Sequence, residues 1–102
     1  NRQKIDIQLI YNDSPISISG IGNGPIDAAA NAIRSFTDEP LEIVDYHEHA
    51  IGEGSAVTAV CYLELKTDNN NTRFGVAKDS NIMTAAIKAM LGGINRKVAV
   101  AA

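Results

Sequence analysis

The stretch GIGNGPID, from Gly20 to Asp27, decides the fold, because a strand must end and a helix must begin within it. Its glycines allow a tight turn and a close approach of other groups to the backbone. Pro25 suits the first position of a helix, and Asp27 lies where the helix dipole favours a carboxylate. The sequence therefore predicts a strand that ends at this loop and a helix that begins at Pro25.

The flanking segments have the periodicities that this prediction requires. Residues 4–11 and 15–19 alternate apolar and polar side chains on either side of the turn residues 12–14, which indicates an antiparallel hairpin. After Pro25, apolar side chains recur at helical spacing until the sequence DEP at 38–40 ends the helix. The expected buried face of this helix consists of Ile26, Ala29, Ala30, Ile33 and Phe36.

A second unit of similar design follows. Its expected elements are strands at 41–51, 56–66 and 72–77, a turn at 52–55, a loop at 68–71, and a helix that Asp79 or Ser80 caps and that runs to about Arg96.

Short segments of the two halves match each other. Ala28 to Ile33 parallels Ala85 to Met90, and Gly20-Ile21-Gly22 parallels Gly75-Val76-Ala77. We interpret this as an internal duplication, and two copies are too few for a solenoid. The predicted fold class is therefore α+β, a pseudo-twofold sandwich in which two helices pack on antiparallel sheets.

Composition narrows the class of protein. The chain has 102 residues, which predicts a single domain over 1–102. A formal net charge of -3 without a basic run argues against nucleic-acid binding. No apolar segment approaches the roughly 20 residues that span a bilayer. The single cysteine, Cys61, forms neither an internal disulfide nor a zinc site by itself, so we expect it to be buried in a cytoplasmic protein.

Two segments could bind a ligand. The loop from Gly20 to Pro25 is not a dinucleotide fingerprint, but it precedes a helix N-terminus, whose free N–H groups suit a carboxylate. The alternative is a tight turn that binds nothing. His47 and His49 share one face of the predicted strand and could ligate a metal, although a zinc site needs a third ligand. The alternative is two solvated or interface histidines, and we expect no metal site.

At the glycine loop the chain resembles a known family. Gly20 to Ala28 resembles the G-x-G-N-G-P-(V/I/L)-x-A motif of the C-terminal regulatory domain of 2-isopropylmalate synthase. Further segments agree in the same order, namely Asp45 to Ala50, Gly52 to Val60, Phe74 to Val76 and Asn81 to Arg96. The resemblance covers nearly the whole chain.

The resemblance implies a fold, a ligand and partners. It implies two βββα-like units related by a pseudo-twofold axis, in a domain that forms a homodimer and binds leucine, with no cofactor of its own. Leucine then inhibits a separate TIM-barrel domain of the same polypeptide, an acyltransferase that condenses acetyl-CoA with 2-oxoisovalerate and uses a divalent metal. In the related citramalate synthases a similar domain binds isoleucine, and the barrel uses pyruvate.

The motif also implies the residues of the effector site. They are Gly22, Asn23, Gly24, Pro25, Ile26 and Asp27 at the start of the first helix, Ile43, Tyr46, Ala50 and Val57 from the following hairpin, and Ala77, Asp79 and Ser80 from the matching loop of the second half. The chain departs from the family at Ala77 and Lys78, where a third glycine and an aliphatic residue are usual. Asp27 or a loop carbonyl would meet the ammonium of the ligand.

Three alternatives stay open at this point. Isoleucine differs from leucine in the position of one methyl group, worth about 1–3 kcal/mol in an apolar pocket. The segments 22–27 and 45–50 favour the leucine-binding type. A dimerisation module without a functional ligand site, and a small metalloprotein that uses His47 and His49, are the other two interpretations.

Overall fold

A computed structural model of the chain describes residues 2–37, 40–54, 57–67, 71–94 and 98–100. In chain order the elements are β1 (Gln3–Tyr11), β2 (Ser14–Gly22), α1 (Pro25–Thr37), β3 (Glu42–Ile51), β4 (Thr58–Lys66), β5 (Thr72–Asp79), α2 (Ile82–Gly93) and β6 (Val98–Val100). The predicted α+β class is confirmed. In the described part of the chain, no helix is long and apolar enough to cross a membrane.

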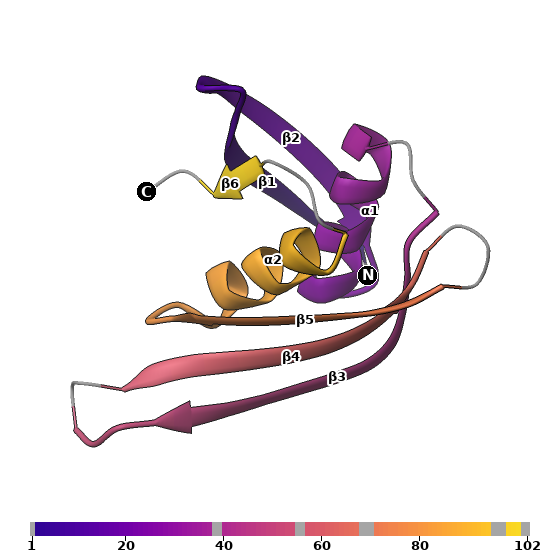
Figure 1. Cartoon of the computed structure of the whole chain (residues 1–102). Helices are drawn as coiled ribbons and strands as arrows, with labels where there is room; N and C mark the ends of the chain where they lie inside the picture. The colour runs from indigo at the N-terminus through magenta and orange to yellow at the C-terminus, as the bar shows by residue number, and fades with distance from the viewer. Residues whose placement is uncertain (1, 38–39, 55–56, 68–70, 95–97, 101–102) are drawn as a thin grey trace.

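The strands form two antiparallel sheets with the helices between them (Figure 1). One sheet has the order β2-β1-β6 and the other the order β3-β4-β5. Helix α1 packs on β1 and β2, helix α2 packs on β4 and β5, and the two helices touch each other. Each sheet thus carries one helix on its inner face, as the internal duplication predicts.

The β1–β2 hairpin closes with a two-residue turn, one residue shorter than the predicted turn at 12–14, because Ser14 already belongs to β2. Tyr11 pairs with Ser14, and the two residues between them, Asn12 and Asp13, have φ angles of 51° and 65°. Positive φ at both central positions matches the twist of the turn to the twist of the strands.

Glycine lets each helix lie directly against its sheet. A Cβ atom at Gly20 would overlap the carbonyl oxygen of Ala28 in α1, and one at Gly75 would overlap the carbonyl oxygen of Ala89 in α2. Both glycines belong to the matching segments of the two halves, so the duplication preserves the same close strand-to-helix contact.

The core lies between the two sheets. Its largest fully buried side chains include Leu9 from β1, Ile33 from α1, Leu63 and Leu65 from β4, and Met90 from α2. Ala29, Ala30 and Ile33 of the expected α1 face are buried, and Ile26 and Phe36 pack against the core at its margin. Cys61 is fully buried, as expected.

The second half differs from the prediction at the start of α2. The N-cap is Asn81, so the prediction of Asp79 or Ser80 was wrong. Asn81 Oδ1 accepts hydrogen bonds from the backbone N–H groups of Met83 and Thr84 at 2.9 and 3.1 Å. Helix α2 ends at Gly93, and the expected end at Arg96 lies outside the described residues, as do Ser55 and Ala56. Strand β6, which pairs with Leu9 to Tyr11 of β1, was not predicted.

Candidate functional site

The N-terminus of α1 is open, whereas the N-terminus of α2 is closed by its own side chain. The Gly24 carbonyl accepts the first helical hydrogen bond, from Ala28 N–H at 2.9 Å. Gly24 offers no side chain as a cap, and within the described residues no side chain accepts from Ile26 N–H or Asp27 N–H. These two amides are therefore free donors at the positive end of the helix dipole.

A surface hollow of about 470 Å³ lies beside these free amides. Its lining consists of Gly24, Pro25, Ile26, Asp27, Ala30, Arg34, Glu42 and Ile43. It falls within the roughly 300–1,000 Å³ of small-molecule sites. The hollow thus combines aliphatic walls with charged groups of both signs.

Hydrogen bonds fix the groups around this hollow. Asp27 Oδ2 accepts from Asn23 N–H at 2.9 Å, which fastens the glycine loop to the first turn of α1. Arg34 donates to the Leu41 carbonyl oxygen and to the side-chain oxygen of Asn31. The Asn31 amide in turn donates to the Ile21 carbonyl oxygen at 2.7 Å. The network connects the end of β2, helix α1 and the segment that enters β3.

The structure brings together five of the predicted effector residues, namely Gly24, Pro25, Ile26, Asp27 and Ile43. Gly22 is buried under the first turn of α1, where a Cβ atom would lie 2.6 Å from both Ala28 N and Asp27 Oδ2. Asn23 contributes its backbone N–H to the bond with Asp27. The motif around the helix start is thus a contiguous structural unit.

Three lining residues were not predicted: Ala30, Arg34 and Glu42. Ala30 and Arg34 follow Ile26 at successive intervals of four, so they lie on the same face of α1. This spacing of four was the one sequence pattern that could have predicted Ala30 and Arg34 as lining residues. Glu42 comes from β3, and its approach to α1 depends on tertiary structure that no local pattern encodes.

Tyr46 lies apart from the hollow, in a polar cluster on the inner face of the second sheet. Its hydroxyl donates to Glu48 Oε2, the partner that a partly buried tyrosine needs. Burial, and then the bond to Glu48, raise the pKa of Tyr46. Burial likewise raises the pKa of the neighbouring Cys61 thiol, which keeps it protonated and unreactive at neutral pH.

The remaining predicted residues lie elsewhere in the chain. Ala50 is near the far end of β3, seven residues from Ile43, or about 23 Å along an extended strand. Val57 precedes β4 at the same far end. Ala77 and Asp79 end β5, and Ser80 follows them. None of these residues lines the hollow, so their part in an effector site stays a prediction.

The start of α2 has its own set of partners. Asp79 binds Lys88 Nζ at 2.8 Å and accepts from Asn81 N–H at 2.9 Å. The bond to Lys88, followed by the bond from Asn81, lowers the pKa of Asp79. Because Asn81 already caps the helix, the two free amides of α1 have no counterpart in α2.

The histidine pair is engaged with other side chains. His47 Nε2 lies 3.0 Å from Asp45 Oδ2, and the His49 ring stacks on Tyr62 at a centroid distance of 5.4 Å. In the described ranges of the chain, no three His, Cys, Asp or Glu side chains are grouped so that they could hold a metal ion.

Comparison with known proteins places these features in a family. The family model of the LeuA allosteric (dimerisation) domain matches residues 1–98. A 2-isopropylmalate synthase of Cupriavidus taiwanensis is 38% identical over 92 residues, which cover 90% of this chain and 16% of that protein. A 2-isopropylmalate synthase of Schizosaccharomyces pombe is 37% identical over 94 residues, which cover 90% of this chain and 16% of that protein.

The match is nearly complete for this chain but partial for its relatives. The chain spans about a sixth of the length of the curated 2-isopropylmalate synthases that it matches, such as that of Ralstonia pickettii, of which it covers 17%. The resemblance inferred from the glycine loop is confirmed, and the chain belongs to the family of LeuA allosteric (dimerisation) domains.

Proposed function

We propose that this chain is the leucine-binding regulatory module of a 2-isopropylmalate synthase and that it forms a homodimer. The observation that carries the proposal is the open N-terminus of α1, where the N–H groups of Ile26 and Asp27 adjoin a hollow with aliphatic walls. The family match and the names of the relatives support the identity of the parent enzyme.

The groups around the hollow suit each part of an amino acid. A carboxylate would accept from the free amides of Ile26 and Asp27, near the Arg34 guanidinium. An ammonium would meet the carboxylates of Asp27 and Glu42. The aliphatic side chain of leucine would pack on the apolar walls. A zwitterion with one apolar substituent therefore satisfies the donors, the acceptors and the apolar surface at once.

Inhibition would follow from linkage between this module and a catalytic barrel in the same polypeptide. Leucine inhibits only if it binds the inactive arrangement of the whole enzyme more tightly than the active one, typically by about 1–3 kcal/mol. The proposed parent reaction condenses acetyl-CoA with 2-oxoisovalerate: the acetyl methyl carbon bonds to the keto carbon, and water releases CoA from the thioester. The divalent metal of that reaction would belong to the barrel, and we assign no residue of this chain to it.

Titration calorimetry with leucine tests the proposal, with Gly24→Val as the variant. A Cβ atom at Gly24 meets nothing within 4 Å, and its φ is not among the positive ones, so the variant should fold and project methyl groups into the hollow. We expect wild-type protein to bind leucine and the variant to bind it at least about tenfold more weakly. Unchanged leucine affinity in the variant would remove the loop from the site.

Isoleucine in the same calorimeter distinguishes the two related enzyme types. Tighter binding of leucine supports the 2-isopropylmalate synthase assignment, and tighter binding of isoleucine supports a citramalate synthase. A dimer that binds neither amino acid would overturn the effector proposal and leave a dimerisation module.

A further inference from the structure

The two sheets have outer faces of different character. On the first sheet, the side turned away from the helices carries mainly polar residues, namely Lys4, Asp6, Gln8, Ser17 and Ser19. There Gln8 Nε2 donates to Ser17 Oγ at 3.0 Å. Such a face is suited to contact with water.

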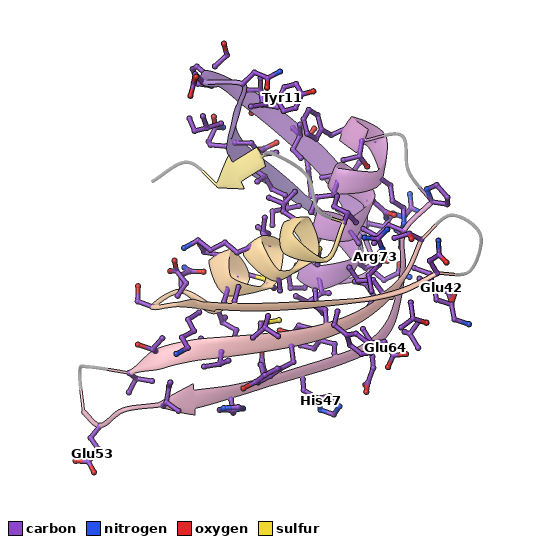
Figure 2. All side chains as sticks on the ribbon, in the orientation of Figure 1. Tyr11, Glu42, His47, Glu53, Glu64 and Arg73 are labelled. Carbon is purple, nitrogen blue, oxygen red and sulfur yellow. The ribbon has the colours of Figure 1, made fainter. Side chains whose placement is uncertain are left out.

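The corresponding side of the second sheet exposes large apolar side chains. Phe74 is 70% exposed and Val76 is 59% exposed, and Tyr62 and Ile51 lie on the same side by strand alternation. Figure 2 shows His47 and Glu64 pointing to this side, away from α2. We call it the β3–β4–β5 outer face. Exposed apolar side chains that neighbour one another across strands, as those of Phe74, Val76 and Tyr62 do, are typical of interaction sites.

We propose that the β3–β4–β5 outer face is the surface on which a second copy of this chain docks. The inference rests on the homodimer proposed above and assigns that homodimer to one surface. Two sheets packed face to face, about 10 Å apart, would interdigitate as the two layers of a β-sandwich do.

The charges on this face are arranged for self-association. Strand pairing places Asp45, Glu64 and Phe74 in one row across the sheet, His47, Tyr62 and Val76 in the next, and His49, Val60 and Lys78 in a third. The first row is acidic and the third is basic, and roughly 13 Å separates them along the strands. A twofold axis across the strands through the middle row sets the acidic row of one copy against the basic row of the other.

The size of the face is that of the centre of a dimer interface. Three strands about 4.8 Å apart and eight residues long give a footprint of roughly 14 by 26 Å. This flat area of roughly 360 Å² is less than half of the roughly 800 Å² per partner of a standard interface, so residues around the face would supply the rest. The Val60 side chain also faces this side, but only 2% of it is exposed, so the centre of the face is already well packed in a single copy.

Analytical ultracentrifugation of the chain tests the proposal with two matched substitutions. Val76→Glu places a charge on the β3–β4–β5 outer face, and Ile21→Glu places one at the matching position of the first sheet, where the side chain is 49% exposed. We expect Val76→Glu to weaken dimerisation at least about 100-fold, because a carboxylate would be buried without a partner. Ile21→Glu should leave the dimer intact. If Val76→Glu fails to fold, Phe74→Ser removes apolar area without adding charge.

Charge reversal gives a second, independent arm. Glu64→Lys and Lys78→Glu should each weaken the dimer, because each puts into one row a charge of the same sign as the charged side chain in the row that faces it on the partner. The double variant restores opposite signs and should restore the dimer. Its failure to do so would overturn the twofold arrangement.

The outcomes separate this proposal from the proposed function. Dimers that withstand both Val76→Glu and Phe74→Ser would overturn the assignment of this face while leaving the homodimer in place. A monomeric wild-type chain would overturn the homodimer and the face together. Leucine calorimetry reports on the effector site separately in each case.

Discussion

Copying the cap of α2 onto α1 should close the proposed effector site without harming the fold. In α2 the Asn81 side chain accepts from the amides of Met83 and Thr84. The equivalent change is Gly24→Asn, which supplies an acceptor for the free amides of Ile26 and Asp27. A Cβ atom at Gly24 meets nothing within 4 Å, so the introduced side chain has room.

The magnitudes follow from the number of donors involved. Asparagine in place of glycine at an N-cap stabilises a helix by a few tenths of a kcal/mol, or about 0.3. Two hydrogen bonds to a charged carboxylate, each worth about 1.5 kcal/mol or more, would be lost to leucine. That loss of about 3 kcal/mol corresponds to a roughly 150-fold weaker Kd. Stability and affinity should therefore change in opposite directions.

Thermal unfolding and titration calorimetry on the same samples check this prediction. Asn81→Gly is the converse control, because it opens the cap of α2 and should lower stability slightly while leaving leucine affinity unchanged. Gly24→Asn with raised stability and unchanged affinity would refute the reasoning, since the amides would then be capped and leucine would still bind.

Three further predictions concern the fold and its ionisable groups. Gly75→Ala should lower the free energy of unfolding by at least about 2 kcal/mol, because its methyl group would overlap a backbone carbonyl of α2. Urea denaturation measures this loss, and Gly24→Ala is the control, because a methyl group there meets no other atom. Cys61 is buried, and burial raises the pKa of its thiol. At neutral pH a disulfide reagent should therefore modify Cys61 at least about 100-fold more slowly in the folded chain than in the urea-unfolded chain. Equal rates of modification would contradict its burial. The hydrogen bond to Lys88 is the main cause that lowers the pKa of Asp79 in the folded state. The stability advantage of wild type over Asp79→Asn should therefore be present above about pH 4 and disappear as the pH falls further. A difference in melting temperature that is the same at pH 7 and pH 2 would contradict this.

Local patterns sufficed for the elements that local forces determine. The alternation in residues 4–11 and 15–19, with the turn residues 12–14 between them, predicted the first hairpin, and Pro25 marked the start of α1. The repeated glycine and alanine segments predicted two sheets, each with one helix. In these places the periodicity, the turn chemistry and the packing all favour the same structure.

Tertiary contacts account for what the sequence did not reveal. Strand β6 has only three residues and forms because β1 has a free edge beside it, which no pattern within residues 98–100 indicates. Asp79, Ser80 and Asn81 are all good N-cap residues, and the path of β5 decides that Asn81 serves.

In the candidate site, too, local patterns predicted some of the residues and tertiary contacts determine the others. Its helix-start motif is contiguous in sequence and remains contiguous in space. The contribution of Glu42 to the hollow required the position of β3 against α1. Ile43 and Ala50 belong to one predicted strand, at 41–51, and the extended geometry of a strand already separates them by about 23 Å.

The central claim is that the amides at the start of α1 receive the carboxylate of leucine. A ¹H–¹⁵N correlation spectrum of the labelled chain, recorded during a leucine titration, tests it most directly. We expect saturable shifts at the N–H groups of Ile26 and Asp27 and little change at those of Met83 and Thr84, which already donate to Asn81. Saturable shifts at Met83 and Thr84 with none at Ile26 and Asp27 would contradict it.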